Sequence, residues 1–298
     1  MQTGYIAKHK PYENTSNRDF SLGKTLRRPL RALRQVFAPA APSVFFTLAI
    51  GLTSINAFAE QFNVLLFTKT DGFHHTSINQ AVTAMEQLSD KHHFKVDWHE
   101  DASQINDENL KQYDVIMFLL TTGNILNDEQ QAAMERFIQS GKGFVGVHSA
   151  SDTEYDWDWY TKMVGRTFHI HPVIQTAELS VISRKFPGLE RMPNKLLWTD
   201  EWYEFGAERS DDLNYILSID ESTYDPKADW GRVAGDGMGK FHPVAWYHNY
   251  DGGRAFYSAL GHMGSTYSDT LFLEHVYGGI YWAATGKGMN STADKNKK

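Results

Sequence analysis

Short apolar runs alternate with segments of helical spacing between residues 60 and 150. The apolar runs predict strands at residues 62–68, 94–99, 113–119 and 143–148. The helical spacing predicts helices at residues 76–91 and 127–141, with a brief helical turn at 107–112. Asn127 and Gln130 have the spacing of a capping box at the start of the second helix. Strands that alternate with helices predict right-handed βαβ units and a mainly parallel sheet.

The second half of the chain has a less regular pattern. We expect a helix at 155–164, strands at 177–182, 215–219, 243–250 and 254–260, and a closing helix at 271–285. The glycine-rich segment 225–239 predicts a long loop, and the polar segment from residue 287 predicts a disordered tail. No repeat or linker interrupts this pattern, so one domain is expected over residues 60–286.

The first 59 residues have the order of a secretory signal. Four arginines between residues 27 and 34 precede an apolar stretch at 44–52, and a small-x-small cleavage pattern ends at Ala59. The apolar stretch is shorter than the roughly 20 residues that span a bilayer as a helix. We therefore expect cleavage after Ala59 and a periplasmic or secreted protein, with an uncleaved membrane-anchoring signal as the alternative.

Acidic residues outnumber basic ones after the predicted signal. Of 29 Lys and Arg and 36 Asp and Glu, 8 and 2 lie in residues 1–59, which leaves 21 basic and 34 acidic residues and a net charge of −13. A protein of this charge repels phosphate backbones, so no nucleic acid is expected as a partner. Cysteine is absent, which excludes disulfides, a thiol nucleophile and thiolate metal ligands.

Polar residues gather where the predicted strands end, which is the edge where open parallel sheets bind ligands. Residues so placed are expected to bind or react rather than to pack. They are Asp71, His74, His75, Thr122, His148, Ser149, Asp152 and His262.

Histidine is frequent, with 12 of the 13 after residue 59. Imidazole is the usual acid or base near neutral pH and a common metal ligand. His169 and His171 have the spacing of two ligands on one face of an extended segment, so a divalent metal held there is one alternative. Asp200 and Glu201 are expected either to complete such a site or to accept hydrogen bonds from sugar hydroxyls.

Residues 146–150 (GVHSA) occupy the position of a nucleophile elbow, the sharp turn that follows a strand. The residue at the apex is His148, which is neither a thiol nor a hydroxyl. Ser149 is adjacent, but neighbouring residues of a strand point opposite ways. Covalent serine catalysis is therefore disfavoured.

Aromatic residues are expected beside these polar groups. All eight tryptophans follow residue 59, and Trp157, Trp159, Trp202 and Trp230 fall in expected loops or near their ends. Aromatic faces with polar neighbours suit carbohydrate rings.

Five segments together resemble one family: 68–75 (TKTDGFHH), 143–153 (GFVGVHSASDT), 164–172, 200–203 (DEWY) and 243–262. In this order they resemble the ThuA-like (trehalose-utilisation) family of the class I glutamine-amidotransferase-like superfamily. The resemblance covers nearly the whole chain after the predicted signal. It implies a flavodoxin-like α/β fold, a three-layer sandwich with a mainly parallel sheet.

The resemblance also implies a place in the catabolism of disaccharides or glycosides, in which glycosides are oxidised to 3-keto sugars before cleavage. Two positions depart from related patterns. His74 stands where the family usually has arginine, which puts an anion-binding role of that arginine in doubt. His148 stands where the glutaminase relatives have cysteine, so amidotransferase activity is not implied.

We therefore expect an enzyme that isomerises, eliminates or hydrolyses a sugar derivative. A carbonyl acidifies the neighbouring C–H, so His148 is expected to abstract that proton while Asp152 orients it. His75 and His262 are expected to donate to the developing enolate oxygen, or to hold a divalent cation there. The residues expected to contact the sugar are Asp71, His74, Thr122, Ser149, Glu201, Trp202 and Tyr203.

Two alternatives remain open at the level of sequence. One is a carbohydrate-binding protein without turnover, and the other is a metal-dependent hydrolase that uses His169, His171 and Glu201. The expected partner in each case is a small-molecule carbohydrate. The sequence leaves open whether a divalent metal is bound and whether the chain forms a homo-oligomer.

Overall fold

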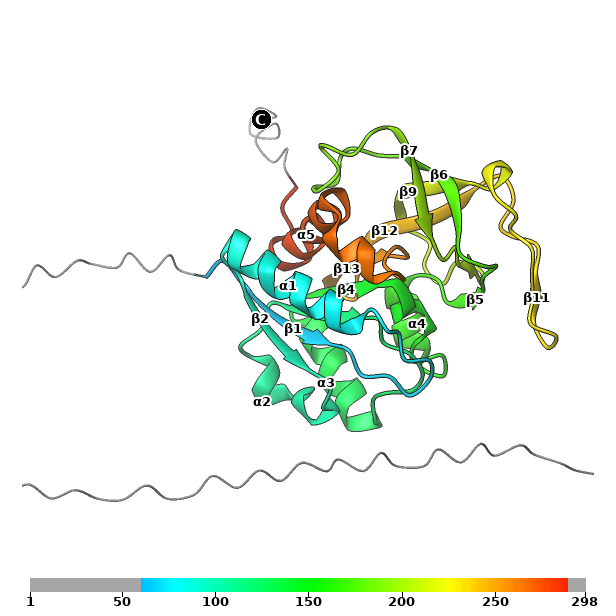
Figure 1. Cartoon of the computed structure of the whole chain (residues 1–298). Helices are drawn as coiled ribbons and strands as arrows, with labels where there is room; N and C mark the ends of the chain where they lie inside the picture. Colours follow the sequence, from blue (N-terminus) through cyan, green and yellow to red (C-terminus); the bar gives the residue numbers. More distant parts are fainter. Residues whose placement is uncertain (1–59, 289–298) are drawn as a thin grey trace, which may run out of the picture. The chain divides into compact units, whose positions relative to one another are not determined.

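The computed structural model describes residues 60–288, and the predicted signal and the predicted tail beyond residue 288 lie outside the described residues. A nine-stranded sheet with flanking helices forms the centre of this part (Figure 1). Its strands are β1 (Asn63–Phe67), β2 (Lys95–His99), β3 (Val115–Leu119), β4 (Gly143–Val147), β6 (Gln175–Val181), β7 (Lys195–Asp200), β9 (Asn214–Asp220), β12 (His242–Tyr250) and β13 (Gly253–Ser258). The helices are α1 (Ile78–His92), α2 (Asp107–Leu110), α3 (Asp128–Gln139), α4 (Asp158–Val164) and α5 (Thr270–Thr285).

Five strands form the parallel half of the sheet, in the order β2-β1-β3-β4-β13. Every residue of β3 and β4 is buried, as continuous apolar runs predict for strands covered on both faces. The parallel βαβ arrangement expected from the sequence is confirmed. Since these strands are parallel, the loops after β1, β3, β4 and β13 meet at one edge.

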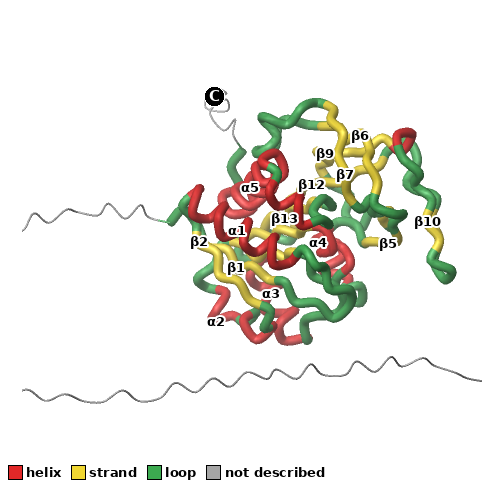
Figure 2. The backbone as a smooth tube through the Cα atoms, viewed as in Figure 1, coloured by secondary structure: helices red, strands yellow, loops and turns green. Residues whose placement is uncertain are grey.

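Helices cover both faces of the parallel half, which gives a three-layer α/β sandwich (Figure 2). Tyr160 of α4 packs on Phe118 and Phe144, with ring centroids 5.7 Å apart in both pairs. Phe256 of β13 packs on His275 of α5 at 5.3 Å. Phe256 pairs with Val145, the residue after Phe144. The side chains of Phe256 and Phe144 therefore point to opposite faces of the sheet. Helices α4 and α5 therefore belong to different layers.

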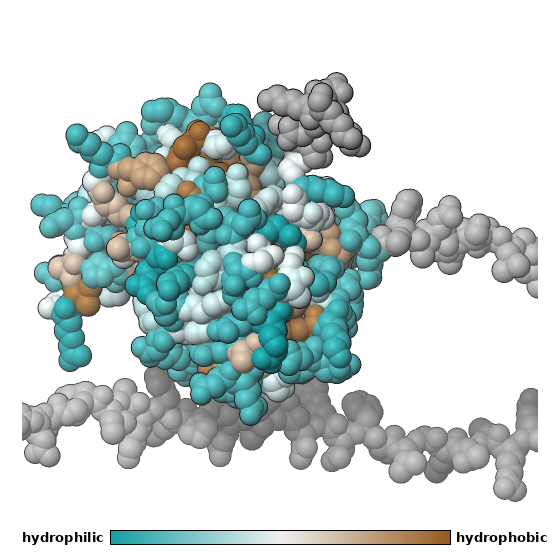
Figure 3. Space-filling view, turned by 180° about the vertical axis from the view of Figure 1, so that it is seen from behind, coloured by the Kyte–Doolittle hydropathy of each residue, from teal (hydrophilic) through white to brown (hydrophobic). Residues whose placement is uncertain are grey.

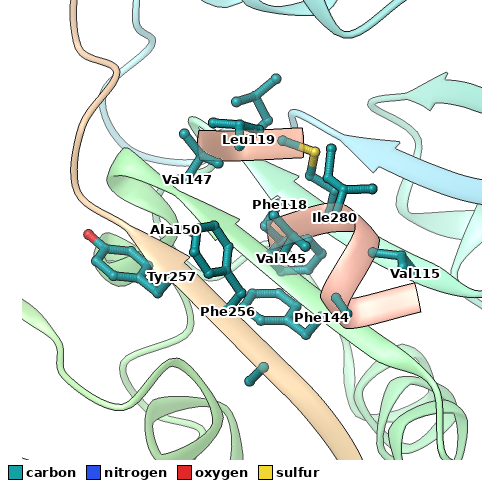
Figure 4. Close-up of a cluster of buried hydrophobic side chains, with 14 of the residues drawn as sticks. Val115, Phe118, Leu119, Phe144, Val145, Val147, Ala150, Phe256, Tyr257 and Ile280 are labelled. Atoms are coloured by element: carbon teal, nitrogen blue, oxygen red, sulfur yellow. The ribbon is translucent and has the colours of Figure 1, made fainter. Parts of the chain in front are cut away.

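The core between these layers is densely aromatic (Figure 4). Phe118 and Phe144 meet edge to face at 5.5 Å, and Val145 and Ile280 are fully buried near them. Close packing of such large side chains fixes the positions of the strand ends. The loops that follow those strands are therefore built on a rigid frame.

Local sequence sets the helix boundaries. Asn127 Oδ1 accepts from the Gln130 amide at 3.0 Å and Gln130 Oε1 accepts from the Asn127 amide at 2.9 Å, so the predicted capping box is present. The helix expected from residue 155 begins only at Asp158, because residues 154–157 form a turn closed by the Trp157 amide on the Glu154 carbonyl.

An antiparallel extension, β12-β9-β6-β7, continues the sheet beyond β13. Its edge strand β7 was not expected from the sequence. The segment expected as a long loop at 225–239 carries a short hairpin, β10 (Ala228–Asp229) with β11 (Ala234–Gly235), which projects from the body in Figure 1. A second small pair is β5 (Phe168–Ile170) with β8 (Glu204–Phe205), and β5 also lies beside β11 of the hairpin.

The surface seen in Figure 3 is mostly polar, with apolar residues in separate patches. Across residues 60–288, no helix has both the length and the apolar character needed to cross a membrane.

Candidate metal centre

Four side chains of ligand type converge at the carboxyl edge of the parallel strands. They come from the loop after β1, the end of β4, the turn after β7 and the loop after β13, and each offers one ligand atom within 4.8 Å of the others. They are His75, His148, Glu201 and His262. We call this set the histidine cluster.

The backbone at His148 is strained. His148 has a φ of 53°, in the left-handed region that costs a non-glycine residue roughly 1–2 kcal/mol. Its carbonyl accepts from the Tyr257 hydroxyl at 2.7 Å, and Ser151 lies 2.8 Å from the same hydroxyl. The sharp turn after β4 is therefore the elbow that the sequence predicts. It turns the imidazole towards the other three members of the cluster.

The tautomer of His148 follows from its partners. Its Nδ1 lies 2.8 Å from the Ala259 carbonyl, which can only accept, so Nδ1 carries the proton. Nε2 then presents its lone pair to the cluster, where the Tyr203 hydroxyl donates to it at 2.8 Å. A histidine held by a carbonyl at one nitrogen, with the other directed inward, has the arrangement of a metal ligand.

Glu201 links the histidines of the cluster. Its Oε2 lies 3.1 Å from His262 Nδ1 and 3.5 Å from His148 Nε2, and its Oε1 lies 3.2 Å from His171 Nε2. Burial acts to raise the pKa of the Glu201 carboxyl, but its contacts with the neighbouring histidines outweigh burial and hold the pKa well below its usual range. The carboxyl is thus an anion within the cluster.

Asp200 fixes the two chain segments that carry Glu201 and His262. Its fully buried carboxylate accepts from the backbone amides of Glu201 at 3.0 Å, Gly261 at 2.9 Å and His262 at 3.1 Å. Trp198 Nε1 adds a fourth contact at 3.3 Å. The residue therefore positions two ligands without facing the cluster itself.

The pKa values of the other two histidines of the cluster, His75 and His262, shift in opposite directions. Burial, reinforced by the nearby His148 and His262, lowers the pKa of His75 to about 2, so its ring is neutral near pH 7. Burial also acts to lower the pKa of His262, but the carboxylate of Glu201 outweighs it and raises that pKa. A cation at this centre would take the place of the proton that His262 otherwise holds beside Glu201.

The spacing and chemistry of the cluster suit a divalent transition metal. His262 Nδ1 lies 3.2 Å from His148 Nε2, and the contacts with Glu201 Oε2 are similar in length. Tetrahedral ligands about 2.1 Å from an ion lie about 3.4 Å apart. Imidazoles with one carboxylate suit zinc, iron or manganese, whereas calcium and magnesium prefer oxygen ligands.

A pocket of about 270 Å³ opens beside the cluster. This is just below the roughly 300–1,000 Å³ of sites that enclose drug-sized ligands, so it suits a single sugar ring. Within residues 60–288, no lysine or arginine lines it. The lining residues are Phe73, His75, Asp152, Phe168, His171, Glu201, Tyr203 and Trp230.

The structure places most of the predicted catalytic residues at this pocket, with one change of arrangement. His75, His148 and His262 meet in the cluster, and Asp152 lines the pocket. Asp152 does not orient His148, however, because the Ala259 carbonyl occupies Nδ1.

The structure separates His169 from His171, the two residues predicted to bind a metal together. His171 reaches Glu201, but His169 is exposed and its Nε2 lies 3.2 Å from the Ala234 carbonyl of the β10–β11 hairpin. The extended segment ends at Ile170, so the two rings no longer share a face. A centre built on His169, His171 and Glu201 is not what the structure forms.

Other predicted sugar contacts are structural. Trp202 is 1% exposed and donates to the Gln175 carbonyl at 3.0 Å, so it packs in the core. Thr122 accepts from the Gly72 amide and donates to the Phe73 carbonyl, which shapes the loop after β1. Ser149 is fully buried, with its hydroxyl 3.5 Å from His75 Nδ1.

Two further residues that were predicted to contact the sugar do not line the pocket. Asp71 and His74 are exposed, and His74 Nδ1 lies 3.2 Å from the Thr70 hydroxyl. Tyr203 and Glu201, by contrast, line the pocket as expected.

Three pocket features were not expected from the sequence. Phe73, 63% exposed, and Phe168 form part of the pocket wall, and Tyr155 donates to the pocket carboxylate of Asp152. Phe73 lies between Asp71 and His74, which were predicted as site residues. This position in the loop is the one feature of the sequence that could have indicated a role for Phe73. Trp230 was expected only as a loop tryptophan.

The fold and the cluster define a flavodoxin-like α/β protein with a candidate metal centre at its ligand-binding edge. The family model for ThuA, trehalose utilisation, matches residues 63–283. The chain belongs to this family, and membership supports a carbohydrate-related role.

Two solved structures are similar to this chain over most of their length. A ThuA-like protein from Bacteroides uniformis has 22% identity and a TM-score of 0.65, over 80% of this chain and 98% of that one. A ThuA-like protein from Parabacteroides merdae has 19% identity and a TM-score of 0.61, over 76% and 91%. At these identities the likeness shows the fold alone. No curated protein matches the sequence significantly.

Proposed function

We propose that this protein is a divalent-metal enzyme that acts on a carbonyl-bearing sugar derivative. The observation that carries the proposal is the convergence of His75, His148, Glu201 and His262 on one point beside a pocket of sugar-ring size. Three neutral imidazoles with one carboxylate leave a bound divalent ion with a net positive charge. Such an ion stabilises negative charge that develops on a substrate oxygen.

The reaction class that fits best is proton abstraction beside a ketone, followed by elimination. A 3-keto glycoside carries an acidic C2–H next to its carbonyl and a leaving group at C1. Stabilisation of the enolate oxygen lowers the barrier to loss of that proton. The carbohydrate-related role of the family supports a sugar as substrate, and the aromatic lining suits its apolar face.

We also propose that the chain works outside the cytoplasm on a small-molecule carbohydrate. The basic run, the apolar stretch and the cleavage pattern within residues 1–59 support export. The excess of acidic residues after residue 59 supports a neutral rather than an anionic substrate.

The proposal is tested by incubating the metal-loaded protein with trehalose and with its 3-keto derivative, each followed by NMR. We expect the keto sugar alone to be consumed, and a chelator to stop the reaction. Release of glucose from unoxidised trehalose would instead identify a metal-dependent hydrolase. Conversion of neither sugar would contradict the proposal and favour a binding protein.

A further inference from the structure

The pocket contains a second carboxylate that the histidine cluster does not use. Asp152 follows the elbow at the end of the 3₁₀ turn His148–Asp152 and lines the pocket. Among residues 60–288, the one hydrogen bond of its carboxylate comes from the Tyr155 hydroxyl to Oδ1 at 2.8 Å. Glu201, by contrast, is engaged by three histidines. Of the two carboxylates, Asp152 is the one whose second oxygen is left to meet a substrate.

His148, the base expected from the sequence, is not placed to take a proton from a substrate. It is fully buried, its Nδ1 is held by Ala259, and its Nε2 faces Tyr203 and the cluster. A base must reach the proton that it abstracts. His148 is therefore placed as a ligand in the histidine cluster, and another group must accept the proton from the substrate.

The surroundings of Asp152 favour its neutral form more than water does. Among the described residues no lysine or arginine lines the pocket, and its wall includes the rings of Phe168, Tyr203 and Trp230. Burial raises the pKa of the Asp152 carboxyl, although the hydrogen bond from Tyr155 and the nearby His148 act the other way. A carboxylate made more basic in this way is a better proton acceptor.

We propose that Asp152 is the general base and acid of this site, acting on a 3-keto glycoside held with its carbonyl oxygen towards the histidine cluster. Asp152 Oδ2 takes the proton from C2, and the C–H electron pair forms the enolate, whose charge lies on the oxygen. The enolate then forms the C1–C2 double bond and regenerates the carbonyl, and the C1–O bond breaks. The departing alkoxide takes the proton back from Asp152, so no oxidant or reductant is consumed.

This inference rests on the proposed function, and proton exchange tests it separately from overall turnover. The metal-loaded protein is incubated with 3-keto trehalose in D₂O, and loss of the C2–H signal is followed by NMR. We expect Asp152→Asn to slow both exchange and elimination by at least about 100-fold, with metal content and keto-sugar affinity close to wild type. Asp156→Asn is the matched control, because Asp156 pairs with Asn124 and does not line the pocket.

A second variant keeps the test valid if asparagine disturbs the turn. In Asp152→Ala, added formate is expected to restore part of the exchange, since a small carboxylate can occupy the space left by the side chain. Exchange within about threefold of wild type in either variant without added formate would overturn the role of Asp152 while the proposed function stands. Absence of exchange and turnover in wild type would overturn both.

Discussion

Asp200 shows how a residue that touches no substrate controls this site. Its buried carboxylate holds the backbone of Glu201 and His262, two of the four proposed ligands. Groups that orient ligands typically contribute 10–100-fold to metal affinity. The positions of two ligands therefore depend on one buried anion.

Replacing Asp200 by asparagine keeps the shape of the side chain but turns one acceptor oxygen into a donor. If the amide nitrogen replaces Oδ1 it opposes the backbone N–H groups of Glu201 and His262, and if it replaces Oδ2 it opposes that of Gly261. We expect metal affinity to fall by about 10–100-fold, as measured by competition with a chelating dye. Unchanged affinity in a variant with an unchanged circular dichroism spectrum would contradict this role.

At the residue scale, the sequence identified most members of the site but not their roles. His75, His148, His262, Glu201, Tyr203 and Asp152 stand at strand ends or in a family segment, and strand ends are where open parallel sheets bind ligands. Roles depend on which atom faces which partner. That His148 is held by Ala259, 111 positions along the chain, cannot be read from spacing.

Trp202, by contrast, was wrongly predicted to belong to the site. Its position beside Glu201 suggested contact with a sugar, yet its ring is 1% exposed. Residues 201–203 lie in the turn between β7 and β8, where the sequence gives no regular alternation of side chains. In the structure Trp202 packs in the core, whereas Glu201 and Tyr203 line the pocket.

At the scale of elements, the parallel half of the sheet was predictable because its strands are continuous apolar runs. Edge strand β7 was not, because its sequence (KLLWTD) has three consecutive apolar residues instead of an alternation, and the middle one, Leu197, is 76% exposed. The turn after β7 supplies Glu201, so the one missed strand of the main sheet leads into the proposed carboxylate ligand. No local pattern indicates that this turn returns to the end of β13.

Helix α5 carries a buried histidine that makes the fold sensitive to acid. His275 is fully buried, with Nε2 3.0 Å from the Ser258 hydroxyl, and burial lowers its pKa from 6.5 to about 3. Below about pH 6.5 the unfolded chain binds a proton at this residue that the folded chain does not. The contribution to stability is therefore lost as the pH falls from about 6.5 towards 3.

We expect His275→Gln to reduce this loss. Glutamine can keep a polar contact with Ser258 and does not titrate. Between pH 6 and pH 5 the free energy of unfolding of the variant should fall by about 1 kcal/mol less than that of wild type. Urea titrations of the metal-free proteins measure this difference. Equal losses in the two proteins would show that His275 does not bear the acid sensitivity.

At the scale of the whole molecule, one end of a rigid sheet collects groups from distant parts of the chain. The four cluster residues span positions 75 to 262, and each follows a strand of the nine-stranded sheet. Such a centre forms only when the fold is complete. Metal binding is therefore expected to stabilise the folded chain, since the unfolded chain does not hold these ligands together.

The net charge of the chain after residue 59 agrees with this account. Acidic residues exceed basic ones by 13, which attracts cations and repels anionic ligands. The carboxylates of Glu201 and Asp152 line the pocket, and within residues 60–288 no lysine or arginine lines it. A divalent ion bound at the proposed centre would add positive charge beside these two carboxylates.

The central claim, that the histidine cluster binds a metal, is tested most directly by elemental analysis of the full chain after exposure to zinc, manganese and iron and removal of free ions. We expect about one ion per chain in wild type and in His169→Ala, whose histidine lies outside the cluster. We expect almost none in His148→Ala and Glu201→Gln. Wild type without metal, or His148→Ala with as much metal as wild type, would contradict this claim.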